Sequence, residues 1–432
     1  MEHILVGILL IPVTTLLLFA STLSMQSKLS EAWVSSLSIR SLFLSWIISF
    51  FLWSWMFVTR TPIEADVFQL VSIRGYELSF HLHFDWIGGT YICFSLGLGF
   101  LIAYFSRTYL HREEGFNRFY FYLFIALIGI ELISLGEGLD VILIGWELVG
   151  ISSALLIAFY FERKTPLDNS LKAYRAYRTT DIGIVMAVIL MHHTFHSSAL
   201  TNFSMLREEH LITIPLLIIF GSMGKGALFP FTYWLPKAME GPTPSSAVFY
   251  GALSVHLSPL LLIRCFSNMK ELPQEVFFTL IAIGLITALY ASWIGRIQSD
   301  IKSVVGYATI AQIGIIWIEI AFGLHVLALI HMIGNASLRT VQLLRAPSLL
   351  HDRQHIIHSK RANFSPTGVL WGKITPLFLQ RTLYFWGIQK DLLQETWDGG
   401  FGIFGFILKG FHKLEQSWIS LLEEPETEKE ER

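Results

Sequence analysis

Apolar segments follow one another along most of the chain, from residue 3 to residue 345, with short polar loops between them. A hydrocarbon core about 30 Å thick requires roughly 20 apolar residues for each helix that crosses it. The pattern therefore predicts an all-α polytopic membrane protein with about eleven transmembrane helices. The predicted spans are 3–24, 41–59, 86–105, 117–135, 138–161, 178–193, 211–228, 243–265, 275–295, 301–321 and 323–345.

The composition supports a membrane protein and excludes other classes. Of the 432 residues, 53% are hydrophobic and 15% are charged, whereas a soluble domain carries about 25% charged residues. The formal net charge is −2, and a nucleic-acid binder would show a basic surface instead. We therefore expect the lipid bilayer, and no nucleic acid, among the partners.

Charged residues concentrate in the last part of the chain. Residues 346–432 hold 21 of the 64 charged residues. This segment also contains two amphipathic stretches, near 367–395 and 400–422, which favour helices lying on a partner or on anionic lipid. We predict four parts. They are N-terminal transmembrane helices (1–65), an external β-hairpin (66–85), an antiporter-like, conducting membrane domain (86–345) and a charged cytoplasmic tail that docks a partner (346–432).

The loops predict the orientation in the membrane. Residues 66–85 alternate apolar and polar side chains on either side of Arg74 and Gly75, a pattern typical of a hairpin. Loops on one side of the eleven spans carry thirteen Lys and Arg residues, and loops on the other side carry five. Because positive residues collect on the cytoplasmic side, we predict a multi-pass protein of the cell (inner) membrane. Its N-terminus and hairpin lie outside, and its C-terminus lies in the cytoplasm.

Ionisable residues inside the apolar spans are the first candidates for function, because a charge at membrane depth is expensive and is usually paired or functional. Five positions qualify: Glu131, Glu147, Lys225, His256 and His331. Glycines and prolines around Lys225 predict an interrupted helix, which membranes tolerate where it lines a buried or wet cavity. A buried lysine beside a carboxylate can bind or release a proton as the pair forms or breaks. The alternative is a static ion pair that fixes helix packing.

A polar stripe marks the last predicted span. His331, Asn335 and Arg339 are spaced at i, i+4 and i+8 and share one helix face. Lys302 begins the preceding span, and together these residues predict a hydrogen-bonded relay through the membrane; the alternative is that His331 serves packing. His351, His355 and His358 lack the support that a metal site needs, so we expect no metal, no cofactor and no catalytic residues in this chain.

Five sequence blocks resemble the proton-conducting, antiporter-like membrane subunits. This family includes the large distal membrane subunit of respiratory complex I (subunit L) and the Mrp antiporter subunits. The resemblance covers roughly residues 80–345, and the blocks occur in the family order. They are EEGFNRFYFY (113–122), GWELVGISSALLIAFY (145–160), KAYRAYRTTDIG (172–183), GSMGKGALFPFTYWLPKAMEGPTPSSA (221–247) and DIKSVVGYATIAQIG (300–314).

The resemblance implies roles for the charged residues. Glu147 and Lys225 would form the charge pair of the first half-channel, with Arg178 and Asp181 at the family's charged positions on the next span. Lys302 would lie near the central relay, and His331 would be one of its histidines. The resemblance also implies a bundle of two inverted repeats, each with a broken helix.

The chain departs from the complex I pattern at several positions. Tyr250 stands where the complex I subunit has a histidine, and Asn335 and Arg339 stand where it has a second histidine and a lysine. Unlike lysine, arginine cannot release a proton near neutral pH. After residue 345 the complex I pattern ends, and the second repeat's broken helix has no counterpart.

The stretch ASLRTVQLLRAPSLLHD (336–352) is more similar to DabB, the membrane subunit of two-subunit inorganic-carbon pumps. That resemblance implies a large cytosolic, zinc-containing DabA-like partner and a role in CO2 and bicarbonate uptake driven by protons or Na⁺. Two alternatives stay open. One is a proton-pumping subunit of an NADH-quinone oxidoreductase or an Mrp-type cation/proton antiporter, and the other is a non-conducting membrane scaffold.

Overall fold

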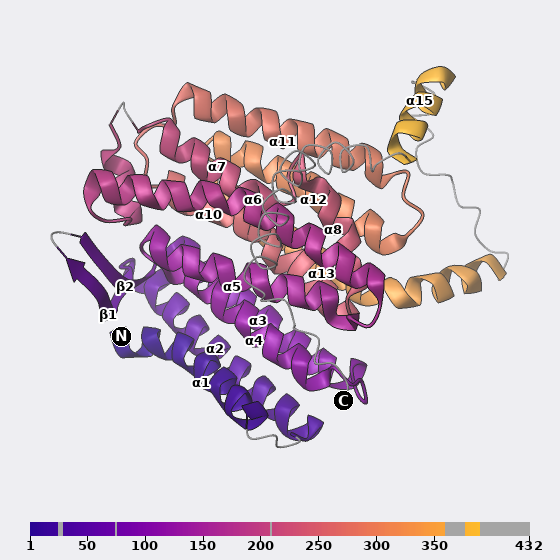
Figure 1. Cartoon of the computed structure of the whole chain (residues 1–432), viewed down its shortest axis with the longest axis horizontal. Helices are drawn as coiled ribbons and strands as arrows, with labels where there is room; N and C mark the ends of the chain where they lie inside the picture. The colour runs from indigo at the N-terminus through magenta and orange to yellow at the C-terminus, as the bar shows by residue number, and fades with distance from the viewer. Residues whose placement is uncertain (25–28, 74–75, 208–209, 359–375, 389–432) are drawn as a thin grey trace, which may run out of the picture. The chain divides into compact units, whose positions relative to one another are not determined.

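The computed structural model describes residues 1–24, 29–73, 76–207, 210–358 and 376–388. The chain divides into two units, Met1–Pro366 and Thr367–Arg432. Within the described part of the first unit, a bundle of long helices carries a small two-stranded sheet near the N-terminus (Figure 1). The described part of the second unit is a single helix, α15 (Leu377–Ile388), whose side chains at Leu377, Phe378, Tyr384 and Phe385 are exposed.

Each predicted span corresponds to a helical segment of the first unit, although three of the helices extend well beyond the predicted span at one end. Among the described residues, eight helical segments are long and apolar enough to cross a membrane, and α7 is apolar but shorter. Helices α6 and α13 account for the two remaining predicted spans, but each is longer and more charged than a typical span. The helices are α1 (Glu2–Ser24), α2 (Glu31–Thr59), α3 (Trp86–Tyr109), α4 (Phe116–Leu135), α5 (Leu139–Ile157), α6 (Lys164–Phe195), α7 (Thr213–Lys225), α10 (Leu257–Phe266), α11 (Gln274–Gly295), α12 (Ile301–Ala321) and α13 (His325–His358).

Shorter helical segments connect several of these helices. They are η1 (Ala158–Tyr160), η2 (Leu200–Met205), η3 (Phe231–Tyr233), α8 (Trp234–Lys237), η4 (Ala238–Glu240), α9 (Thr243–Ser245), the π-helical η5 (Ser246–Leu253) and η6 (Ser254–His256). The last three run directly into α10. The all-helical membrane fold that the sequence predicts is therefore confirmed for the described residues.

One helical run lies at the centre of the bundle. In the segment Thr243–Phe266, every residue is buried. By contrast, about a third or less of the apolar stretch is buried in α1, α2 and α11. Leu17, Phe57 and Leu289 on these outer helices are exposed, and such a large apolar surface suits contact with lipid rather than water.

The predicted hairpin is present with slightly different bounds. Strands β1 (Ile63–Ile73) and β2 (Tyr76–Phe84) pair antiparallel, with Ile63 opposite Phe84. An isolated bridge joins Leu82 of β2 to Gly136, in the turn between α4 and α5. The sheet is therefore anchored to the bundle by backbone hydrogen bonds as well as by the buried side chains of Leu82 and Phe84.

Part of the sequence prediction for the tail lies outside the described residues. The stretch 400–422 and the acidic end fall there entirely. Of the stretch 367–395, only residues 376–388 are described, and they include the helix α15. The role of the tail in docking a partner stays a prediction.

Candidate functional site

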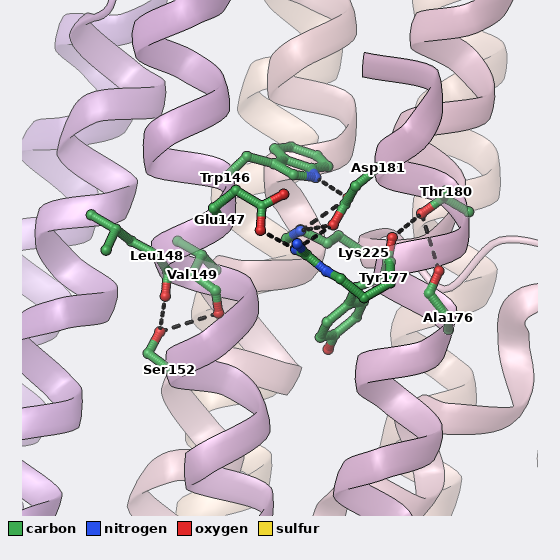
Figure 2. A network of polar contacts seen from close by, with 11 residues as sticks. Trp146, Glu147, Leu148, Val149, Ser152, Ala176, Tyr177, Thr180, Asp181 and Lys225 are labelled. Carbon is green, nitrogen blue, oxygen red and sulfur yellow. Dashed lines mark hydrogen bonds and ion pairs between the residues drawn. The ribbon is translucent and has the colours of Figure 1, made fainter. Parts of the chain in front are cut away.

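Two acidic and two basic side chains meet between α5, α6 and α7 (Figure 2). Glu147 of α5 forms an ion pair with Arg178 of α6. Arg178 also donates a hydrogen bond to Oδ2 of Asp181, one turn later on α6, at 2.7 Å. Asp181 in turn accepts from Nζ of Lys225, the last residue of α7, at 3.2 Å and 3.4 Å to its two oxygens. We call these four residues the charge cluster.

The pairing within the charge cluster differs from the sequence prediction. The family resemblance implies that Glu147 and Lys225 form a charge pair. In the structure Lys225 pairs with Asp181, and Glu147 pairs with Arg178. The reason is geometric, since Arg178 reaches both carboxylates and lies between the two pairs. Glu147 and Lys225 are therefore linked by a chain of contacts that runs through Arg178 and Asp181.

The break after α7 places Lys225 at a helix end. The chain continues from Lys225 through a short non-helical segment into η3 and α8, which confirms the interrupted helix predicted here. The indole N–H of Trp234 donates to the carbonyl of Gly224 at 2.8 Å and satisfies one of the carbonyls freed at the helix end. A helix C-terminus also carries partial negative charge, which favours a cation at this position.

Glycines allow the helices around the charge cluster to approach closely. A Cβ on Gly183 of α6 would lie 2.4 Å from the carbonyl oxygen of Leu217 on α7. A Cβ on Gly150 of α5 would lie 3.2 Å from Lys225 Nζ. Larger residues would separate α6 from α7, or would press directly against the lysine, so the glycines fix the distances within the cluster.

The charge cluster has a buried half and a more open half. Lys225 is completely buried, and the Asp181 side chain is 4% exposed, whereas the Glu147 and Arg178 side chains are 28% and 35% exposed. Lys225 Nζ lies 4.6 Å from the ring centre of Trp146, and the indole N–H of Trp146 donates to Asp181 at 2.6 Å. Trp146 therefore holds both members of the buried pair, although it is not among the residues predicted from the sequence. Its position next to Glu147 was the available signal.

A second polar group joins the central helical run to α13. Asn335 of α13 lies 3.1 Å from Nε2 of His256, and its side-chain oxygen accepts from Arg339 at 3.1 Å. The other ring nitrogen of His256, Nδ1, bonds the carbonyl of Ala252. Tyr250, on η5, is buried and donates to the carbonyl of Ser153 on α5 at 2.7 Å. These contacts make one hydrogen-bonded line of His256, Asn335 and Arg339.

A third polar group lies where α12 and α13 face each other near their shared turn. His331 Nδ1 is 2.8 Å from Glu319 Oε1, and His331 Nε2 is 2.8 Å from Gln312 Oε1. His331 is among the residues predicted from the sequence, whereas Glu319 is not. Two signals could have identified it, since Glu319 is an acid within an apolar span and follows Gln312 by seven residues, which places both on one helix face.

Two predicted residues lie apart from these groups. Lys302, at the start of α12, donates to the carbonyl of Met239 at 3.4 Å. Ten residues of helix, about 15 Å, separate it from Gln312, so the structure does not bring Lys302 to His331. Glu131 of α4 is buried, and neither of its carboxylate oxygens has a hydrogen-bond partner among the described residues.

The described residues contain no cluster of three or more histidine, cysteine or acidic side chains that could hold a metal ion. Lys225, Glu147, Asp181, Glu319 and His331 can each gain or lose a proton, whereas Arg178 and Arg339 stay charged.

Comparison with known proteins places the chain in a family. Residues 137–385 match the family described as NADH:quinone oxidoreductase/Mrp antiporter, TM. Residues 70–120 match the N-terminus of NADH-ubiquinone oxidoreductase (complex I), chain 5. The chain is 28% identical over 395 residues to NADH-quinone oxidoreductase subunit L of Neisseria meningitidis, covering 86% of this chain and 58% of that protein. It is 30% identical over 334 residues to NADH-ubiquinone oxidoreductase chain 5 of Felis catus, covering 76% of this chain and 54% of that one. The chain thus spans little more than half the length of these relatives.

Solved structures share the fold. The Mrp complex from Dietzia contains a chain with a TM-score of 0.67 and 21% identity, where the match covers 79% of this chain and 36% of that one. An archaeal respiratory complex, the membrane-bound sulfane sulfur reductase, contains a chain with a TM-score of 0.68 and 18% identity, covering 79% and 70%. The family match extends over more than half of the chain and includes the whole charge cluster. The chain therefore belongs to the NADH:quinone oxidoreductase/Mrp antiporter transmembrane family.

Proposed function

We propose that this protein conducts protons as a membrane subunit of a larger complex, and that the charge cluster is the group that exchanges them. The observation that carries the proposal is the buried pair of Lys225 and Asp181 at the interrupted end of α7. A pair of this kind is expensive to bury and is weak evidence for stability. An intramembrane ionisable residue is by default a candidate for an ion or proton pathway.

The charge balance of the cluster suggests how it conducts. Two carboxylates face two protein cations, so the formal charge is zero with Lys225 protonated. Any excess charge in a medium of low dielectric constant is strongly disfavoured. When the more open Glu147 takes up a proton, the cluster becomes positive, and loss of the Nζ proton from Lys225 restores neutrality. One proton entering at Glu147 therefore expels one proton at Lys225.

The same balance favours protons over Na⁺. A bound Na⁺ would need carboxylate charge that is not already neutralised. Within the cluster both carboxylates are taken by Arg178 and Lys225. The cluster can therefore exchange protons, but it offers no uncompensated negative charge to a metal cation.

The relatives named above suggest the setting. One relative is named as a subunit of an NADH-quinone oxidoreductase. The two matched structures are chains of the Mrp complex and of the membrane-bound sulfane sulfur reductase complex. A partner complex of the complex I or Mrp type is accordingly the best-supported setting. The second candidate is the inorganic-carbon pump with a DabA-like partner, which the stretch 336–352 favours. A non-conducting scaffold is the third, and the charge cluster argues against it.

One purification tests both the conduction and the setting. The protein is isolated from its native membrane with its partners, the partners are identified by mass spectrometry, and the complex is placed in liposomes. We expect proton flux under an imposed gradient, unchanged when choline replaces Na⁺, together with partners of the complex I or Mrp type. A large soluble zinc protein as the main partner would favour the carbon pump instead. Flux no greater than in empty liposomes would overturn the proposal of conduction.

The orientation is a further part of the proposal. The bias of Lys and Arg places the start of the hairpin outside and the loop between α5 and α6 in the cytoplasm. Thr61, just before β1, and Thr165, at the start of α6, are exposed threonines next to these two places. In a chain with Cys93 and Cys265 changed to alanine, a membrane-impermeant thiol reagent should label Thr61→Cys in intact cells. It should label Thr165→Cys only after the membrane is opened, and the reverse result would invert the topology.

A further inference from the structure

His331 and His256 differ in the kind of hydrogen-bond partner that each ring nitrogen faces. His331 lies between two side-chain acceptors, Glu319 Oε1 at Nδ1 and Gln312 Oε1 at Nε2, each at 2.8 Å. A ring nitrogen that faces an acceptor must carry a hydrogen to bond it. The arrangement is thus satisfied when both ring nitrogens are protonated, and the Glu319 carboxylate balances the resulting positive charge.

His256 has the opposite arrangement. Its Nδ1 bonds a backbone carbonyl, which can only accept, and its Nε2 faces the amide nitrogen of Asn335, which can only donate. These two contacts fit a neutral ring with its hydrogen on Nδ1. Asn335 does not titrate, and Arg339 keeps its proton. Of the two groups, the pair of Glu319 and His331 is therefore the one in which both partners can take part in proton exchange.

One carboxylate oxygen of Glu319 makes no hydrogen bond among the described residues. Its Oε1 bonds His331, while its Oε2 is buried and has no hydrogen-bond partner among the described residues. The Glu319 side chain is 15% exposed and that of His331 is 23% exposed. The pair is thus partly shielded from its surroundings, and one carboxylate oxygen is available to take a proton.

We propose that Glu319 and His331 form a second proton-exchanging pair, in which Glu319 keeps His331 protonated. In the resting state His331 carries two ring protons and Glu319 is ionised. Transfer of the Nδ1 proton to Glu319 leaves a neutral ring and a neutral acid, so no net charge is created within the pair. The Gln312 side chain holds the Nε2–H meanwhile. Glu319 acts here as a positioning residue for His331, and the inference rests on the proton conduction proposed above.

Other charged or titratable groups lie on α13 itself and on the elements beside α12 and α13. They are His256 on η6, Arg264 on α10, Glu275 at the start of α11, and His325 and Arg339 on α13. Arg264 bonds the carbonyl of Ile133. Glu275 is exposed and lies at the same end of the bundle, since the rings of Phe277 and Phe322 are 5.4 Å apart. Glu275 is consequently a matched control for Glu319.

The test is the pH profile of proton flux in liposomes that contain the purified complex. Glu319→Gln keeps the size of the side chain but removes the charge that stabilises the protonated ring. Flux that needs protonated His331 should then fall off about one pH unit lower than in the wild type, which is about a tenfold loss on the alkaline side. Glu275→Gln should leave the profile in place, and Glu319→Asp should restore most of it.

The outcomes separate this inference from the proposed function. A wild-type profile in Glu319→Gln, in a complex where Lys225→Met abolishes flux, would overturn the second pair and leave conduction intact. If Glu319→Gln fails to assemble, His331→Gln decides the matter, because it removes the ring that exchanges the proton and should reduce flux to background at every pH. Flux with the wild-type pH profile in His331→Gln would overturn the inference.

Discussion

Asp181→Asn is expected to reduce proton flux to background, although asparagine has nearly the size and shape of aspartate. Asp181 is the residue that contacts both cations of the charge cluster, Arg178 and Lys225. Without its charge, the cluster holds two cations against Glu147 alone and carries an excess positive charge. Lys225 then restores neutrality by remaining deprotonated, and it can no longer release a proton when Glu147 takes one up.

The measurement compares Asp181→Asn with a matched change on the same helix. Asp168 lies thirteen residues earlier on α6 and is exposed, so Asp168→Asn alters the helix charge equally but leaves the cluster whole. Both variants should insert and assemble, and only Asp181→Asn should lose flux. Full flux in Asp181→Asn would show that the buried pair does not take part in conduction.

The sequence alone is sufficient to predict the membrane-spanning helices and the residues of the charge cluster, but not the contacts between those residues. Apolar runs of about 20 residues specify the spans because of the thickness of the membrane. Glu147 and Lys225 stand out because each is a charge within such a run. Which partner each one takes depends on how helix faces meet. That depends on close contacts such as Gly183 against α7, which hydropathy does not record.

The polar groups on α12 and α13 show the same limit. Helical spacing correctly places Asn335 and Arg339 on one face, where they bond each other. The same spacing cannot determine that His331 of α13 faces Gln312 and Glu319 of α12 rather than Lys302. Contacts between helices that run in opposite directions depend on their register, and the register is set by packing along their whole length.

The second large effect separates a conducting pair from a static one. Lys225→Met removes a buried cation and leaves Glu147 and Asp181 facing Arg178 alone. Breaking a buried ion pair in this way destabilises a protein by about 3–5 kcal/mol. We therefore expect Lys225→Met to lower the unfolding temperature of the complex and to abolish proton flux together.

Adding Asp181→Asn to Lys225→Met returns the cluster to neutrality, with Glu147 and Arg178 still paired. Replacing both members of a buried pair by neutral side chains is often harmless to stability, so the double variant should regain most of the lost unfolding temperature. The coupling between the two sites in a double-mutant cycle should be correspondingly large. Flux should nevertheless stay at background, because no lysine proton is left to release. If flux returned together with stability, the pair of Lys225 and Asp181 would be a packing element, and the conducting group would have to lie elsewhere in the bundle.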